Sequence, residues 1–184
     1  MDFLKVIEKR RSIRAYMDKM PSDEDVLSII QCGHRAPTGG NIQPWEFIII
    51  KDQEVKRAVV DTTYVGNDYD GLRHQEWIMQ APVIIAVLAN KSKSYARYGE
   101  KALESLIYLD CSACIENMLL AAVNLGLGSC YISGFREDEL AKALKLPENY
   151  KRIAFLPLGY QKGDAVINPK ADISNIIHYD FFQE

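Results

Sequence analysis

Apolar residues along the chain follow two alternating patterns. Short continuous apolar runs predict buried strands at residues 47–50, 82–88, 130–132 and 153–156. Between these runs, apolar residues recur every three or four positions. This spacing predicts helices over residues 2–11, from residue 22 onward, and over 54–60, 100–125 and 137–144. Residues 91–98 are expected to be an exposed, mobile segment. Strands separated by helices predict a three-layer domain of the α/β or α+β class.

The second predicted helix has a clear beginning. Ser22 follows a proline and precedes Asp25 by three residues, an arrangement typical of an N-cap with a capping box. The buried face of this helix is expected to consist of four apolar side chains: Val26, Leu27, Ile29 and Ile30.

Two segments are too apolar to be covered by one subunit. Helix 100–125 is apolar nearly all round in its second half and rich in small residues, and Gly126 is a suitable end for it. Residues 169–184 carry six large apolar side chains, namely Ile173, Ile176, Ile177, Tyr179, Phe181 and Phe182. We therefore expect a single domain over residues 1–184 whose C-terminal tail, about residues 169–184, wraps around the partner in an intertwined homodimer.

Composition excludes several classes of protein. The 184 residues are 48% hydrophobic and 26% charged, which is ordinary for a globular domain. A net charge of −3 disfavours nucleic acid and anionic membranes as partners. No apolar run approaches the roughly 18 uninterrupted residues of a membrane span, and the first residues do not resemble a signal peptide. We expect a cytoplasmic protein.

The four cysteines include one CxxC pair, Cys111 and Cys114. A redox dithiol or a zinc site would fit that spacing. However, the pair lies inside the predicted long helix, and the chain has no second ligand pair and only three histidines. Buried core thiols are therefore the favoured interpretation.

Two polar segments carry the chemistry. The first, residues 10–14, places Arg10, Arg11, Ser12 and Arg14 in five positions, and guanidinium groups bind phosphate bidentately. The alternatives are solvated cations at a helix end or a localisation or RNA-binding patch, which the acidic total disfavours. The second segment, residues 36–45, could be a simple connection from helix to strand. A turn, however, does not need asparagine, glutamine and tryptophan after two glycines. Together the segments suit a ligand with a phosphate tail and a flat head that forms hydrogen bonds, as in flavin mononucleotide (FMN).

Other motifs are missing from the sequence. Residues 128–135 follow the long helix and predict a strand and a glycine turn, but they match neither GxGxxG nor a Walker motif. There is no GxSxG and no HExxH, and the histidines lack metal-ligand spacing, so a hydrolase or a metalloenzyme has little support.

The order of these motifs resembles the nitroreductase family of FMN-dependent oxidoreductases. The resemblance rests on RRSIR, APTGGNIQPW, GLGSCYISGF, LPLGY and a final lysine-containing tail, and it spans nearly the whole chain. It implies an α+β fold with a mixed central sheet flanked by helices, dimerised through the long helix, with two FMN sites at the interface.

The resemblance also implies roles for individual residues. Arg10, Arg11 and Ser12 would hold the phosphate and ribityl region, Lys170 would complete the phosphate site, and Arg14 would lie near the N1–C2 edge of the flavin and tune it. The partner subunit would supply a loop, and a further strip would pass near flavin N5. The remaining candidates are Pro37, Thr38, Gly39 and Asn41 in the loop, Ile132, Ser133 and Gly134 in the strip, and Asn67 at the pyrimidine edge. Many family members have an acidic residue where this chain has Ser133.

The implied reaction is a ping-pong exchange. NADH or NADPH reduces the flavin, and a small acceptor such as a nitroaromatic or a quinone then takes the electrons. No catalytic side chain beyond Arg14 is expected, and no metal. The alternatives are a flavin-binding sensor with little turnover and a specialised dehalogenase or flavin-fragmenting enzyme. A dehalogenase lid would draw on Tyr95, Tyr98, Glu100 and Lys101, which do not form a convincing match.

Overall fold

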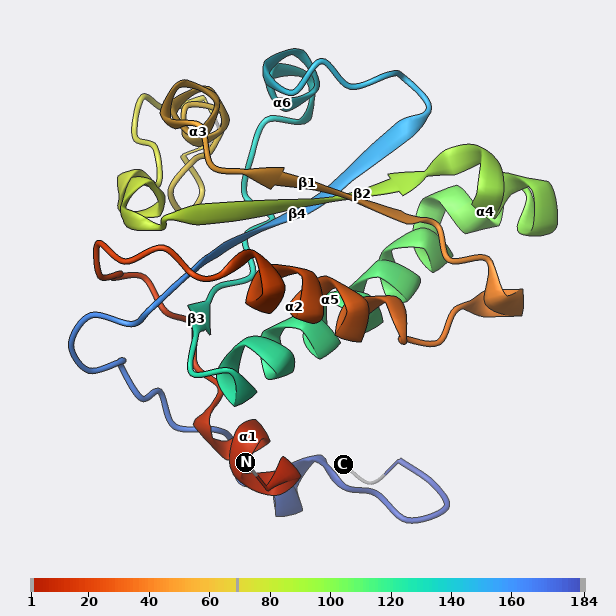
Figure 1. Ribbon diagram of the computed structural model, residues 1–184. Helices are drawn as coiled ribbons and strands as arrows, with labels where there is room; N and C mark the ends of the chain where they lie inside the picture. Colours follow the sequence, from red (N-terminus) through yellow and green to blue (C-terminus); the bar gives the residue numbers. More distant parts are fainter. Residues whose placement is uncertain (1, 69, 183–184) are drawn as a thin grey trace.

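The computed structural model describes residues 2–68 and 70–182, which form a four-stranded sheet between two layers of helices (Figure 1). The strands are β1 (Trp45–Ile50), β2 (Val83–Asn90), β3 (Gly128–Ser129) and β4 (Tyr150–Gly159). The helices are α1 (Phe3–Lys9), α2 (Asp23–His34), α3 (Gln53–Val60), α4 (Lys91–Tyr98), α5 (Ile107–Asn124) and α6 (Glu137–Ala143). Short 3₁₀ helices are η1 (Gly39–Asn41), η2 (Glu76–Gln80) and η4 (Ile173–Ile176), and η3 (Ala102–Leu106) is a π-helical segment before α5.

The strand order is β1-β2-β4-β3, so β1 lies at one edge of the sheet. All pairs of these four strands are antiparallel. In the part of the chain that the structure describes, the parallel component of the expected mixed sheet is a single isolated bridge between Ser12 and Ser129. That bridge attaches the arginine-rich segment to the end of the sheet.

The two faces of the sheet carry separate cores, as the three-layer expectation requires. Along β2, Val83, Ile85 and Val87 face the α2–α5 layer, whereas Ile84 and Ala86 face the layer of α3 and α6. This division follows from the two-residue period of a strand. All five side chains are fully buried, so β2 is covered on both sides.

Helix α5 is the central helix of the lower layer in Figure 1. By length and composition alone, Ala102–Asn124 could span a membrane. Core helices of globular proteins meet the same criterion, and here Ile107, Cys111 and Ile115 are fully buried against α2 and the sheet. Burial also raises the pKa of the Cys111 thiol, and it raises that of Cys114 to about 12. Both cysteines are free core thiols, in agreement with the favoured interpretation.

Three local expectations need correction. Residues 91–98 form helix α4, which the Asn90 side chain caps by accepting hydrogen bonds from two backbone N–H groups. The third strand is shorter and earlier than expected: β3 is Gly128–Ser129, and Ile132 makes only an isolated bridge to Phe155. Leu27 is 52% exposed although it belongs to the apolar face of α2, because nothing in the described chain covers it.

Candidate functional site

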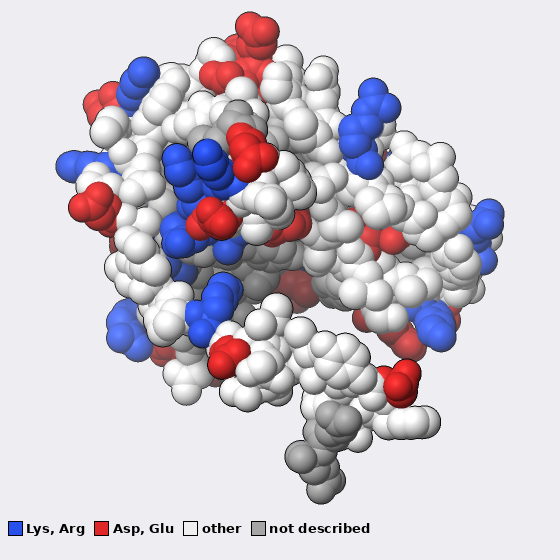
Figure 2. Space-filling model, turned by 90° about the horizontal axis from the view of Figure 1, so that it is seen from below, with Lys and Arg blue, Asp and Glu red and all other residues white. Residues whose placement is uncertain are grey.

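The predicted phosphate-binding residues surround one small cavity. Its volume is about 200 Å³, and it is lined by Arg10, Arg11, Ser12, Arg14, Val166, Asn168 and Lys170. None of these lining residues is acidic, so four cationic side chains share the cavity with hydroxyl, amide and apolar groups. Figure 2 shows Lys and Arg side chains beside a hollow on the face seen from below. This donor set fits a phosphate group, which accepts several charge-assisted hydrogen bonds at once.

The end of the sheet positions the arginine-rich segment. The backbone N–H of Ile13 donates a hydrogen bond of 3.0 Å to the carbonyl of Ser129, next to the parallel bridge. Close approach depends on Gly128, because a Cβ there would lie 2.7 Å from the Ile13 side chain. With Ile13 buried at 6% exposure, its neighbours Ser12 and Arg14 are left exposed. Packing of one apolar side chain thus directs the polar ones to the cavity.

Arg14 has an aromatic neighbour that the sequence did not reveal. Its guanidinium carbon lies 5.9 Å from the centroid of the Trp77 ring, at the outer limit of a cation–π contact. Behind it, burial raises the pKa of the Cys130 thiol, and the positive charge of Arg14 opposes part of that rise. Cys130 is therefore a neutral thiol beside the cationic cluster.

The loop that follows α2 has a fixed and unusual backbone. Gly40 and Asn41 have φ values of 59° and 58°, in the left-handed region that glycine and asparagine tolerate best. Thr38 closes the loop, since its carbonyl accepts from the Asn41 N–H at 3.0 Å and its hydroxyl accepts from the Gln43 N–H at 3.1 Å. Pro37 and Asn41 are exposed, and the Gln43 side-chain amide donates to the Asn41 side-chain oxygen at 2.8 Å.

Helices α4 and α5 both contact this loop. The Gly39 N–H donates to the Asp110 carboxylate of α5 at 3.1 Å. Tyr98 and Arg97 of α4 pack against the two glycines, where a Cβ on Gly40 would lie only 2.1 Å from the Arg97 Nε. Gly40 is thus favoured by its left-handed backbone conformation, and Gly39 leaves room for the Tyr98 ring.

The strip at residues 132–134 lies beside β4, to which it is joined by an antiparallel bridge. Ile132 is buried and forms two backbone hydrogen bonds with Phe155, whereas Ser133 is exposed. The Gly134 carbonyl accepts from the Tyr64 N–H at 3.3 Å and faces the Gln75 amide at 3.4 Å. A strip with one exposed hydroxyl and a fixed backbone suits contact with a flat ring.

The structure gathers some of the predicted site residues and separates others. The arginine-rich segment and Lys170 lie near the α1–β3 end of α5, whereas the Pro37–Asn41 loop lies near its α4 end (Figure 1). Helix α5 has 18 residues, which corresponds to about 27 Å. Asn67 is exposed and does not line the cationic cavity. One subunit therefore does not bring all the candidates to one place.

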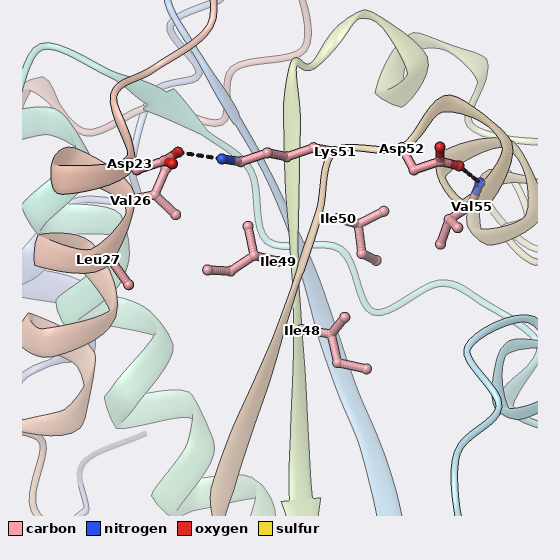
Figure 3. Close-up of a pocket in the computed structure, with 9 residues that line it drawn as sticks. All are labelled: Asp23, Val26, Leu27, Ile48, Ile49, Ile50, Lys51, Asp52 and Val55. Atoms are coloured by element: carbon pink, nitrogen blue, oxygen red, sulfur yellow. Dashed lines mark hydrogen bonds and ion pairs between the residues drawn. The ribbon is translucent and has the colours of Figure 1, made fainter.

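A largely apolar groove lies between α2 and the edge strand β1. One part has a volume of about 610 Å³ and is lined by Asp23, Val26, Leu27, Ile48, Ile49, Ile50, Lys51, Asp52 and Val55. Figure 3 shows Ile49 pointing towards α2, while Ile48 and Ile50 point to the other side of the strand; the Lys51–Asp23 ion pair bridges the two elements. A second hollow of about 620 Å³ lies along the same two elements, lined by Ile30, His34, Phe47 and others.

The comparison with known proteins agrees with this geometry. The sequence profile of the nitroreductase family matches residues 7–160. The chain belongs to the nitroreductase family. The matched region includes the arginine-rich segment, the glycine loop and the strip, whereas Lys170 lies beyond it.

Similar proteins cover most of this nitroreductase family member. A relative from Archaeoglobus fulgidus, provisionally named an NADH dehydrogenase/NAD(P)H nitroreductase, is 35% identical over 165 residues, which are 88% of this chain and 86% of the relative. The crystal structure of a nitroreductase family protein from Clostridium difficile has a TM-score of 0.82 and 28% identity, covering 99% of this chain and 100% of that one. The predicted family and its α+β fold are confirmed.

Two more distant relatives have other names. An iodotyrosine deiodinase from Thermotoga neapolitana is 26% identical, over 95% of this chain and 96% of the relative. An FMN reductase (NADPH) from Bacillus subtilis is 24% identical, over 95% of this chain and 72% of the relative. Nitroreductase family membership is therefore compatible with more than one acceptor.

Several residues at the candidate site had no signal in the sequence. Val166 and Asn168 complete the cationic cavity, Trp77 lies against Arg14, and Gln75 lies against Gly134. Each is brought there by tertiary packing from a segment without a motif of its own. Proximity to Lys170 is the one clue that could have suggested Asn168.

Proposed function

We propose that this protein is an FMN-dependent oxidoreductase that uses NADH or NADPH to reduce small electrophilic acceptors, such as nitroaromatics and quinones, by a ping-pong exchange. The observation that carries the proposal is the cavity in which Arg10, Arg11, Arg14 and Lys170 meet without an acidic neighbour in its lining. Membership of the nitroreductase family and the FMN reductase relative support the same cofactor.

When bound, FMN accepts a hydride from the nicotinamide donor and passes electrons to the acceptor. The chain contributes binding and electrostatics. Arg10, Arg11 and Lys170 supply charge-assisted hydrogen bonds to the phosphate, and Ser12 supplies a hydroxyl beside them. Arg14 carries a permanent positive charge, and it would favour the more negative state of the flavin if the ring bound beside it. No side chain is assigned as a proton donor, because the strip near the ring offers only the Ser133 hydroxyl and backbone groups.

We propose further that the active unit is a homodimer in which the partner subunit contributes the loop over residues 37–41. In one subunit the arginine-rich segment and the loop over residues 37–41 lie at opposite ends of α5. A two-fold axis across α5 would bring the loop of one subunit next to the arginine-rich segment of the other. Exposed apolar side chains on α1 and α5 support such a contact, with Phe3 at 64%, Leu4 at 66% and Leu109 at 65% exposure.

The tail gives this dimer a second contact. From residue 166 onward its large apolar side chains are exposed, including Ile173 at 67% and Phe181 at 81%. We propose that the partner's tail occupies the groove between α2 and β1, because β1 is an edge strand and the groove is apolar. The tail would then cover Leu27 and Ile49, which are exposed in one subunit.

A second candidate function is reductive dehalogenation, which the deiodinase relative favours. Tyr95 and Tyr98 of α4 are 50% and 40% exposed, and the Tyr98 ring lies against Gly39 of the loop. An aromatic substrate stacked on the flavin could contact these rings.

We assign the protein to the cytoplasm, in keeping with four free thiols in the described residues.

The first experiment is an anaerobic titration followed by visible absorption. The protein reconstituted with FMN should be yellow and should bleach on addition of NADH or NADPH. Reoxidation by nitrobenzene or a quinone, but not by iodotyrosine, would favour the first function, and the reverse would favour dehalogenation. A bound flavin that neither donor bleaches would favour a sensor, and failure to bind FMN would overturn the proposal.

A further inference from the structure

The residues that lead into η2 lie against two parts of the candidate flavin site. The Gln75 side-chain amide donates to the Tyr64 carbonyl at 3.1 Å and to the Gly134 carbonyl at 3.4 Å. Two residues later, the Trp77 ring lies near Arg14. These contacts come from one segment, and none belongs to a motif that the sequence marked.

The Gln75 and Tyr64 side chains fill the space beside Gly134 into which any larger residue at position 134 would extend. A Cβ on Gly134 would lie 3.3 Å from the Tyr64 ring and 3.4 Å from the Gln75 amide nitrogen. The Gly134 carbonyl also accepts the Tyr64 N–H at 3.3 Å. The Gly134 carbonyl therefore has two donors, and removing the Gln75 amide would leave it only the Tyr64 N–H among these two.

Gln75 is itself held on both sides. Its backbone N–H donates to the hydroxyl of Thr63, a fully buried residue, at 2.8 Å. The next residue, Glu76, forms a two-point ion pair with Arg57 of α3, with distances of 3.0 and 2.8 Å. The Arg57 guanidinium lowers the pKa of the Glu76 carboxyl, so this pair persists at neutral pH. The backbone around Gln75 is therefore attached to Thr63 and to α3, which places its side-chain amide beside Gly134.

We propose that Gln75 is a positioning residue that fixes the Ser133–Gly134 backbone against the flavin ring. This role rests on the proposed function, since it is the ring that the strip is expected to contact. Gln75 does not touch the phosphate cavity, whose lining residues come from other segments. Its effect is therefore on the geometry of hydride transfer and not on cofactor affinity.

Two substitutions separate the effect of losing the amide donor from the effect of changing the size of the side chain. In Gln75→Leu both carbonyls lose the amide donor. In Gln75→Glu the shape is kept, but an ionised carboxylate faces two carbonyl oxygens, whereas the protonated acid can donate to one of them. The carbonyl oxygens favour the protonated form and should raise the pKa of the new carboxyl. Gln80→Glu is the matched control, because Gln80 is exposed at the other end of η2.

Two readouts test the role. In hydrogen–deuterium exchange on the protein without NAD(P)H, amides of residues 131–136 should exchange about tenfold faster in Gln75→Leu than in the wild type or the control. In stopped-flow reduction of bound FMN by saturating NADH, Gln75→Leu should be about tenfold slower. Gln75→Glu should gain a pH transition, with the rate falling as pH rises. FMN affinity should stay within threefold of the wild type in all variants.

The outcomes distinguish the role from the function on which it rests. The wild type could bleach normally while the variants show wild-type amide exchange, wild-type rates of FMN reduction and no new pH transition. That result would overturn the role of Gln75 alone. A wild type that binds no FMN would overturn the proposed function and the role with it. If Gln75→Leu does not fold, Gln75→Glu compared at pH 6 and pH 9 decides the question.

Discussion

Arg10 belongs both to an ion pair and to the cationic cavity. Its Nε lies 3.7 Å from the Glu116 carboxylate, and the guanidinium also lines the cavity. The ion pair is partly exposed and contributes at most about 1 kcal/mol to stability. A phosphate bound in the cavity would gain more from the same guanidinium, because such a charge-assisted hydrogen bond contributes about 1.5–3 kcal/mol.

Arg10→Ala should therefore weaken FMN binding by roughly 10- to 100-fold. The measurement is a titration of the apoprotein with FMN, followed by quenching of flavin fluorescence. Glu116→Gln is the control, since it removes the ion pair and leaves the cavity cation in place. If Arg10→Ala binds FMN as tightly as the wild type, the phosphate does not lie in this cavity.

Lys56 is a residue whose burial affects stability. It is 1% exposed, and its ammonium donates to the Ala81 carbonyl at 3.0 Å. Burial lowers the pKa of Lys56 from its ordinary value of 10.5. At a pH between the lowered value and 10.5, the unfolded chain binds the proton and the folded chain does not. Stability from this group therefore rises with pH through that window and is flat outside it.

Lys56→Met should remove this pH dependence. The difference in free energy of unfolding, wild type minus variant, should increase from neutral pH towards pH 10 with a slope of at most about 1.4 kcal/mol per pH unit. Urea unfolding at several pH values measures it. Parallel curves for the two proteins would mean that Lys56 has the same pKa in the folded and unfolded states.

The contact between β3 and the arginine-rich segment is the element on which the cavity depends. Gly128→Ala would place a Cβ 2.7 Å from the Ile13 side chain and force the two backbones apart. We expect a loss of about 1–3 kcal/mol in stability, measured by chemical denaturation, together with weaker FMN binding. Ile13→Ala removes Cγ1 and Cγ2 of Ile13, which lie close to that Cβ. The double variant should therefore lose less stability than the sum of the losses in the two single variants. If the stability losses of Gly128→Ala and Ile13→Ala simply add, the two residues are not in direct contact.

The elements that could be predicted are those whose signal is local. Ser22 caps α2 through the Asp25 N–H, and Gly126, at φ 75°, follows the end of α5, as their positions in the sequence indicate. Helix α4 was missed because its hydrophobic pattern is weak, and its stability comes from the Asn90 cap and contacts with its neighbours. Arg10 to Arg14 were found because charge clusters are visible in sequence, whereas Gln75 and Trp77 reach the site only through tertiary packing.

At the scale of the whole molecule, the groove along β1 and the C-terminal tail both leave large apolar side chains uncovered in the described residues. The groove along β1 has exposed Leu27 and Ile49, and the tail has exposed Ile176 and Phe182. Each large apolar side chain that becomes buried stabilises an assembly by about 1.5–3 kcal/mol. A tail that reaches the partner's groove would therefore account for both surfaces, whereas a monomer leaves both in water.

Ile49→Asp in the groove and deletion of residues 173–184 in the tail should therefore have the same result. Each should shift the dimer towards monomer by at least tenfold in dissociation constant, measured by sedimentation over a concentration series. Leu72→Asp is the control, because Leu72 is 92% exposed but lies in neither surface. FMN affinity should fall in parallel with dissociation, since the partner's loop is then lost while Arg10 and Lys170 remain. A stable dimer in both variants would place the tail elsewhere, and a monomer that keeps full FMN affinity would show that the site is complete within one subunit.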